Sequence, residues 1–252
     1  MKFYSIAVAI TISSAAATSR GKGGKGKGGK RKSKKGSKSP QAIEEADMDV
    51  LVNAFCSTVV AISYAFWENG GQNAIDGTGE IYPQAACDAA YDVALGALNG
   101  AYNYPDPVLF KPTLTTAPFT FRPTKAGALS YFIGTDCLLK SGSSEDFSDN
   151  ESQYPPGNTG AFREYGFGLG NYRTGYLGFD DCEWNPDGYV TGEGIGLAQG
   201  QVAFTRTEGE IATVDKTWGF GISRDGGVVI TAHHSSAVIE PDGSTQYEGL
   251  PE

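Results

Sequence analysis

The sequence predicts an α+β fold in which N-terminal helices pack on a curved antiparallel sheet. Residues 42 to 134 hold three segments with the spacing or the end signals of helices. Residues 161 to 239 hold short extended runs separated by turn signals, which are typical of a strand meander. Helices followed by strands favour the α+β class. We expect one domain over residues 42–242 and a tail over 243–252.

The first 41 residues do not have the composition of a folded domain. Residues 1–19 contain a lysine, an apolar run too short to span a bilayer, and then small residues, which is the pattern of a secretory signal peptide. Residues 20–41 form a Gly/Lys-rich arm with ten Lys/Arg and no acidic residue. Such a segment cannot bury enough surface to fold, so disorder is expected. The protein is therefore expected in the secretory pathway, extracellular or at the cell surface.

The basic arm contrasts with an acidic body, because the whole chain has a net charge of −9 despite the arm. Two interpretations of the arm stay open: a solubilising linker, or a contact with polyanionic cell-surface or wall material. Nucleic acid is not an expected partner, since the arm lacks aromatic residues that stack on bases. After the signal peptide we expect no segment apolar enough to cross a membrane.

Three helices are expected. The first covers 42–67, with apolar residues at spacings of three and four, and is stopped by ENGGQN. Its apolar positions are Met48, Leu51, Val52, Phe55, Val59, Ile62 and Phe66. The second covers 83–102, with Pro83 in its first turn. The third is short, covers 124–134 and has Thr124 as its N-cap. The prolines between the last two helices leave room only for short extended pieces such as VLFKPTLT.

Six extended runs follow, with tight turns expected at NPDG (185–188), TEGE (207–210) and RDGG (224–227). Strands joined by such turns pair antiparallel. The runs cover residues 161–170, 174–184, 188–200, 201–207, 211–222 and 227–239.

Four cysteines in an exported protein predict two disulfides. Three pairings of Cys56, Cys87, Cys137 and Cys182 are open. A Cys56–Cys87 bond would join the first two helices and is the preferred first pair. Asn150 begins the tripeptide Asn-Glu-Ser and could accept an N-glycan if the secretory route is eukaryotic.

The two histidines of the chain stand together after the apolar stretch VVIT. In an extended strand successive side chains face opposite ways, so His233 shares a face with Ser235, and His234 shares the other with Ser236. One imidazole and one hydroxyl therefore point together into whichever face is concave. The sequence leaves open which pair this is, and it also permits a strand end in solvent.

The histidine count limits metal chemistry. A catalytic zinc needs about three protein ligands around one point, and the chain has no third histidine. An oxygen-ligated ion such as Mn²⁺ or Mg²⁺ could use the carboxylates of GFDDCEW (178–184), although a solvated strand edge is the expected role of these acids. No cofactor is the first expectation, and Mn²⁺ is the alternative.

Five short motifs, in order, resemble the iota-class carbonic anhydrases. They are VLFKPT (108–113), FRPT (121–124), ALSYF (128–132), VDKTWGF (214–220) and HHSS (233–236). The resemblance spans about residues 45 to 240. It implies a cone-shaped fold similar to the SnoaL-like enzymes and nuclear transport factor 2, a homodimer, and reversible hydration of CO₂ to bicarbonate. Several members of this family are described as working without a metal, while others are linked to Mn²⁺.

The resemblance also implies a set of site residues. Carried over to this chain, they are Thr113, Tyr131 and, within HHSS, His233, His234, Ser235 and Ser236. We expect a water held by the hydroxyls to be polarised by the inward imidazole, which would titrate near neutral pH and act as general base. The same hydroxyls would stabilise charge on the CO₂ oxygens.

Two other functions stay open. The alternative is a non-catalytic member of the same fold that binds a ligand or forms oligomers and is tethered by its basic arm. A SnoaL-like isomerase or lyase is the third. Trp218 and Phe220 are expected as core or dimer-face aromatics.

Overall fold

A computed structural model of the chain describes residues 41–72, 82–104, 106–113, 120–142, 166–169, 178–207 and 209–238. The expected signal peptide, the tail and Asn150 lie outside the described residues, as does the arm except for its last residue.

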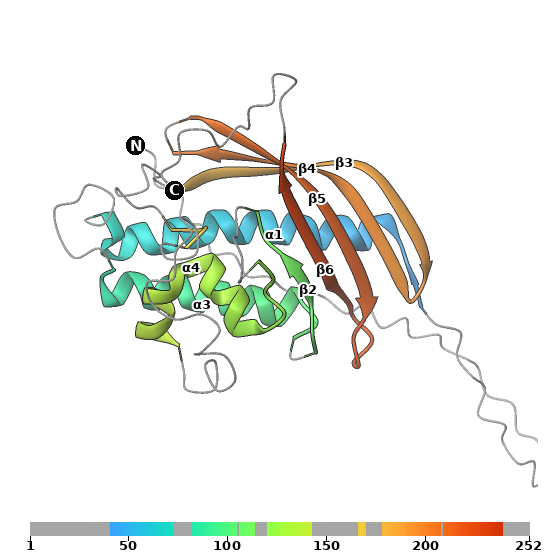
Figure 1. Ribbon diagram of the computed structural model, residues 1–252, viewed down its shortest axis with the longest axis horizontal. Coiled ribbons are helices and arrows are strands. Elements are labelled where there is room, and N and C mark those ends of the chain that lie inside the picture. The colour runs from blue at the N-terminus through green and yellow to red at the C-terminus, as the bar shows by residue number, and fades with distance from the viewer. Residues whose placement is uncertain are drawn as a thin grey trace, which may run out of the picture.

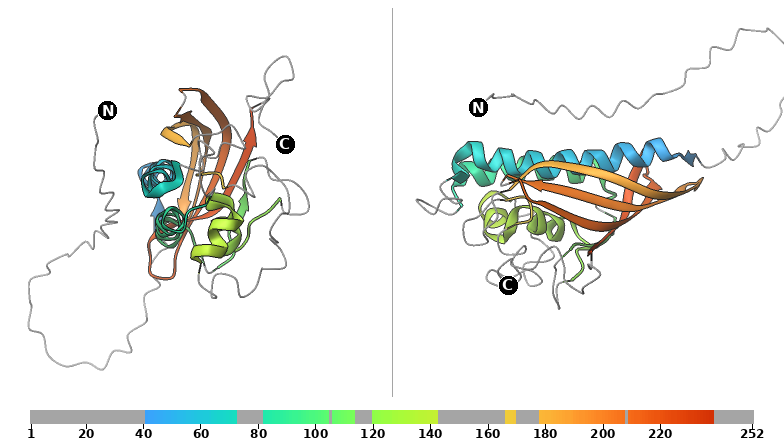
Figure 2. Two further views of the ribbon diagram at one scale, coloured as in Figure 1. Left: turned by 90° about the vertical axis from the view of Figure 1, so that its left-hand side faces the viewer. Right: turned by 90° about the horizontal axis from the view of Figure 1, so that it is seen from above.

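The described residues form a six-stranded sheet that curves over three helices (Figures 1 and 2), so the mixed α+β class is confirmed. The helices are α1 (Glu45–Phe66), continued by the π-helical turn η1 (Trp67–Gly71), α3 (Gln84–Ala101) and α4 (Lys125–Ser141). The strands are β1 (Ala42–Ile43), β2 (Leu109–Lys111), β3 (Phe179–Glu193), β4 (Ile195–Arg206), β5 (Ile211–Ile222) and β6 (Val228–Ala237).

Helix α1 lies against the inner face of the sheet and supplies much of the core. The seven apolar residues predicted from its periodicity are all buried. At its start the Asp47 carboxylate accepts the Glu44 N–H at 3.1 Å, which stabilises the first turn. Contrary to the expectation from the sequence, the helix Glu45–Gly71 has the length and the apolar composition needed to cross a membrane. Half of its most apolar 18-residue stretch is, however, buried inside the fold.

The strand order is β1-β3-β4-β5-β6-β2, and β3 to β6 pair antiparallel as predicted. The turn at RDGG joins β5 to β6, also as predicted. The TEGE segment falls between β4 and β5, and Glu208 within it lies outside the described residues. The predicted turn at NPDG is wrong, because β3 continues through it with an irregularity between Pro186 and Gly188. The chain reverses instead at Gly194, whose φ of 73° favours glycine. Strand β4 is unbroken where two runs were predicted, and residues 166–169 of the first predicted run form no strand.

Strand β2 comes from the proline-rich segment and joins the edge of the sheet parallel to β6. The short extended piece was predicted, but its parallel pairing was not. In this register Phe110 pairs with His233, and Lys111 with His234. The pairing brings the KPT motif alongside the HHSS motif.

Helix α4 begins where predicted, since the Thr124 hydroxyl accepts the N–H three residues on, at 3.2 Å. It continues beyond its predicted end, with a kink at Gly134 (φ 75°, ψ 155°) in a region that only glycine adopts without strain. Upstream of the kink the Tyr131 carbonyl accepts the Phe167 N–H at 2.7 Å. This contact fixes the turn of α4 that carries the SYF motif.

Two disulfides cross-link the fold, as predicted, but the preferred pairing is wrong. Cys56 of α1 bonds to Cys182 of β3, and Cys87 of α3 bonds to Cys137 of α4. Helices α1 and α3 do pack together, yet Cys56 lies on the side of α1 that meets β3, and Cys87 on the side of α3 that meets α4. All four cysteines are therefore oxidised, which is consistent with an extracellular protein.

Candidate active site

Strand β6 separates the two predicted histidine–serine pairs onto its two faces. His233 and Ser235 point into the protein, with exposed fractions of 1% and 0%. His234 is exposed, and Ser236 is half-buried on the same outer face. The interior pair is therefore His233 with Ser235.

The hydroxyl of Thr113 meets the hydroxyl of Ser235. Strand β2 ends at Lys111, and its parallel course along β6 carries Thr113 to this position. The two hydroxyls are hydrogen-bonded and both residues are buried. Because one hydroxyl donates to the other, the second hydroxyl hydrogen is left for another acceptor. The pair thus offers both a donor and lone pairs inside the protein.

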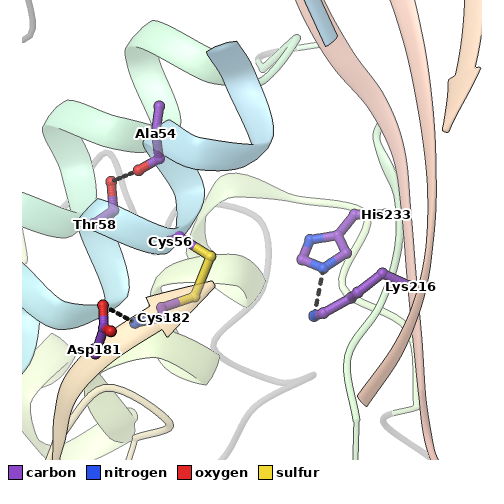
Figure 3. Close-up of a disulfide and its surroundings, with 7 residues drawn as sticks. All are labelled: Ala54, Cys56, Thr58, Asp181, Cys182, Lys216 and His233. Carbon is purple, nitrogen blue, oxygen red and sulfur yellow. Dashed lines mark hydrogen bonds between the residues drawn. A yellow bond between two sulfur atoms is a disulfide. The ribbon is translucent and has the colours of Figure 1, made fainter. Parts of the chain in front are cut away.

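The imidazole of His233 is held on every side. It stacks between Trp218 and Phe110, with ring centroids 3.9 Å and 4.6 Å away. Its Nδ1 lies 2.9 Å from the Tyr102 hydroxyl, and its Nε2 lies 2.9 Å from Nζ of Lys216. Figure 3 shows the Lys216 contact, on the side of the sheet that faces α1 and the Cys56–Cys182 disulfide. Both ring nitrogens are therefore engaged with protein groups.

This environment keeps the imidazole neutral. Burial first, and then the neighbouring charge of Lys216, hold the pKa of His233 well below its usual 6.5. The expectation that the inward imidazole titrates near neutral pH is therefore wrong. A neutral imidazole with both nitrogens engaged is suited to positioning its neighbours rather than to exchanging protons with water.

Lys216 is a buried amine in an aromatic enclosure. It is 4% exposed, and its Nζ lies 4.9 Å from the ring centre of Phe55, 5.6 Å from that of Trp218 and 6.0 Å from that of Phe204. Burial lowers its pKa to about 7, with a smaller contribution from the charge of Lys111. The group that titrates near neutral pH in this site is thus the lysine.

Tyr131 is connected to the site through the ring of Phe110. Its ring is buried, stacks on Phe167 at 5.2 Å and meets Phe110 edge-on at 5.7 Å. Phe110 in turn stacks on His233. The structure therefore gathers Thr113 and the interior pair of β6 at the β2–β6 edge and places Tyr131 one ring away.

The side chains do not fit the alternative metal site. Within the described parts of the chain, no three His, Cys, Asp or Glu side chains gather closely enough to hold an ion. The carboxylates of GFDDCEW lie at exposed positions of β3, and the four cysteines are all in disulfides. An Mn²⁺ ion therefore has no ligand set among these residues.

Two residues of the site, Tyr102 and Lys216, were not predicted from the sequence. Lys216 did leave a signal, because it shares the inward face of β5 with apolar residues, and a lysine on the apolar face of a strand is unusual. Tyr102 left none, since it follows the end of α3 and meets His233 only through the folded chain.

Known proteins resemble this chain over most of its length. A family model described as metal-independent carbonic anhydrase matches residues 46–237. A protein of Nostoc sp. (strain PCC 7120) named metal-independent carbonic anhydrase is 31% identical over 200 residues, which cover 79% of this chain and 76% of that protein.

A crystal structure of a cyanobacterial iota-carbonic anhydrase complexed with bicarbonate is also similar. It aligns with a TM-score of 0.54 and 28% identity, over 79% of this chain and 94% of the other. The description of the family as metal-independent agrees with the expectation of no cofactor. Because the family model covers well over half of the sequence, this chain belongs to the metal-independent carbonic anhydrase family.

Proposed function

We propose that this protein is a carbonic anhydrase that interconverts CO₂ and bicarbonate at the hydroxyl pair of Thr113 and Ser235. Membership of the family supports the reaction, and the bicarbonate complex of the similar cyanobacterial enzyme supports the ligand. The observation that carries the assignment of the site is the buried hydroxyl pair next to a neutral His233.

The reaction has an apolar substrate and an anionic product, and the site has groups suited to each. CO₂ is apolar, so the aromatic walls formed by Phe110 and Trp218 suit the substrate. The product is an anion, so the remaining hydroxyl hydrogen of the pair is placed to donate to the oxygen that gains charge. One such donor contributes about 10²–10³-fold to a rate. The hydroxyl lone pairs accept from the attacking water and orient it toward the carbon of CO₂.

The other residues of the site have supporting roles in this proposal. His233 fixes Lys216 and Tyr102 and forms part of the wall. Tyr131 is assigned to the site as a further hydroxyl on the α4 side. His234 and Ser236 lie on the opposite face of β6 and take no part.

The proposal also covers the setting of the enzyme. A signal peptide over 1–19 would export a domain over 42–242, and the two disulfides support an oxidising compartment. A cone-shaped SnoaL-like fold and a homodimer complete the proposal, as the family resemblance implies. The arm over 20–41 would serve as a linker or contact polyanionic wall material.

Stopped-flow measurement of CO₂ hydration on chelator-treated protein tests the function. The stripped wild type is expected to remain active, with its metal content checked by elemental analysis. Ser235→Ala should lower kcat/KM by about 10²-fold or more, because it removes half of the hydroxyl pair. The matched control Ser236→Ala, one residue along the same strand, should retain wild-type activity.

Each contrary result has a definite meaning. Activity that returns only with added Mn²⁺ would replace this scheme with a metal-assisted one. Equal losses in the two serine variants would refute the choice of the inner face. No activity under any condition would favour a non-catalytic module that binds a ligand or forms oligomers.

A further inference from the structure

Lys216 breaks the pattern of the strand that carries it. The inward residues of β5 are otherwise apolar and buried: Ala212, Val214, Trp218 and Phe220. Among the described residues, Lys216 is the one lysine that is buried. Ordering and desolvating an amine here costs free energy that an apolar residue would not, so its presence needs a functional reason.

Lys216 and Ser235 lie on neighbouring strands of the sheet. Lys216 is directly opposite Ser235 in the β5–β6 register, and both side chains point into the protein. Cβ atoms of directly opposite residues are about 5 Å apart in an antiparallel pair. Nζ of Lys216 lies 2.9 Å from Nε2 of His233, whose side chain is on the same face of β6 as that of Ser235.

No anionic side chain among the described residues neutralises this amine. Strand β6 presents His233 to it, and β2 contributes the charge of Lys111. Tyr102, directly after α3, contacts the other nitrogen of the imidazole. Helix α1 and strand β4 contribute aromatic rings. Of the described residues, no carboxylate forms an ion pair with Lys216. Aromatic faces attract an ammonium but do not cancel its charge.

We propose, resting on the carbonic anhydrase function above, that Lys216 is the proton acceptor of CO₂ hydration and the counter-charge of the bicarbonate that forms. The neutral amine takes one proton from water as the water oxygen bonds to the carbon of CO₂. The π electrons of one C=O bond move to oxygen, so the products are HCO₃⁻ and the Lys216 ammonium. After bicarbonate leaves, the ammonium gives its proton to solvent buffer, and the cycle closes.

The buried surroundings of Lys216 suit both the neutral amine before the reaction and the ammonium that forms with bicarbonate. Burial favours the neutral amine while no anion is present, and its pKa of about 7 matches a base that works at neutral pH. Once bicarbonate lies beside it, the ammonium is paired and becomes the favoured form. Lys216 thereby does what a metal-bound hydroxide and its metal cation do elsewhere.

The pH dependence of kcat/KM tests the proposal. For the wild type, kcat/KM for CO₂ hydration should rise with pH through a midpoint near 7, where Lys216 loses its proton. Lys216→Met should lower kcat/KM by about 10²–10⁴-fold and abolish this dependence, because it removes the base. Lys216→Arg should fail equally, since a guanidinium stays protonated. Lys125→Met, at the surface where α4 begins, is the control and should match the wild type.

A second measurement does not depend on turnover. NMR of wild-type protein labelled with ¹³C at lysine Cε should show one lysine that titrates near pH 7, absent from the Lys216→Arg spectrum. Bicarbonate should raise that midpoint, and chloride at equal ionic strength should not. If Lys216→Met does not fold, this titration decides.

The outcomes separate the two proposals. Wild-type activity with an unchanged pH profile in Lys216→Met, or full activity in Lys216→Arg, overturns the inference and leaves the function standing. A Lys216 signal that titrates near pH 10 overturns the inference as well. Absence of hydration by the wild type overturns the function and the inference together, while a bicarbonate-sensitive Lys216 signal would then still support an anion site.

Discussion

Replacing Lys216 with methionine should change how the stability of the protein depends on pH. In the unfolded chain the lysine has its ordinary pKa of 10.5, and in the fold burial lowers this to about 7. Between these two values the unfolded state binds a proton that the folded state does not. The free energy of unfolding of the wild type therefore rises with pH in this window and falls toward pH 7, by about 1.4 kcal/mol per pH unit.

The full effect follows from the size of the shift. A pKa lowered by about 3.5 units corresponds to roughly 5 kcal/mol that the wild type loses between pH 10.5 and pH 7. The Lys216→Met variant has no such group. The free energy of unfolding of Lys216→Met minus that of the wild type should therefore fall as pH rises. From about pH 7.5 to about pH 9 the difference should fall by about 2 kcal/mol. The hydrogen bond and ring packing of the amine set a constant offset between the two proteins and do not alter this slope.

Equilibrium urea unfolding measures the slope. Both proteins are unfolded with their disulfides intact, followed by tryptophan fluorescence, at several pH values across the window. Lys125→Met serves as the control, because Lys125 donates to Asn99 at the surface, and its curve should run parallel to the wild type. Parallel curves for the wild type and Lys216→Met would refute a lowered lysine pKa and remove the basis for a neutral amine.

Three further changes test how the fold supports the site. Replacing Cys56 and Cys182 together by alanine should cost about 5 kcal/mol, because their bond closes a loop across 126 positions; thermal unfolding against the wild type measures this, and a cost below about 1 kcal/mol would contradict it. Gly134→Ala should destabilise the protein by about 1–3 kcal/mol, because alanine is strained at the α4 kink. Gly96→Ala should instead stabilise α3 by about 0.5–1 kcal/mol, because a Cβ there meets no other atom. Equal effects of the two substitutions in urea unfolding would contradict the need for glycine at the kink. Tyr102→Phe should cost about 1–3 kcal/mol by leaving the imidazole Nδ1 without its partner, and an unchanged unfolding midpoint would show that this bond contributes nothing.

Local patterns were sufficient to predict much of this fold. The spacing of residues such as Met48 and Phe55 predicted the buried face of α1, because helix geometry alone decides which residues share a face. Alternation predicted that His233 and Ser235 share one face of β6, and burial decides that this is the inner one. The family resemblance supplied Thr113, which the fold then brings to Ser235.

Contacts between distant segments were not predictable in the same way. The parallel pairing of β2 with β6 joins segments more than a hundred residues apart, and nothing in either segment specifies it. The Cys56–Cys182 bond depends on the rotation of α1 against the sheet rather than on the order of the helices. The neutral state of His233 follows from its burial and its lysine neighbour, which the chain brings together only on folding.

The location of bound bicarbonate tests the central claim most directly. A crystal structure of the metal-free protein soaked in bicarbonate should place the anion against the hydroxyls of Thr113 and Ser235, with the Lys216 amine as its nearest cation. Bicarbonate bound on the outer face beside His234, or bound only in the presence of a metal ion, would contradict it.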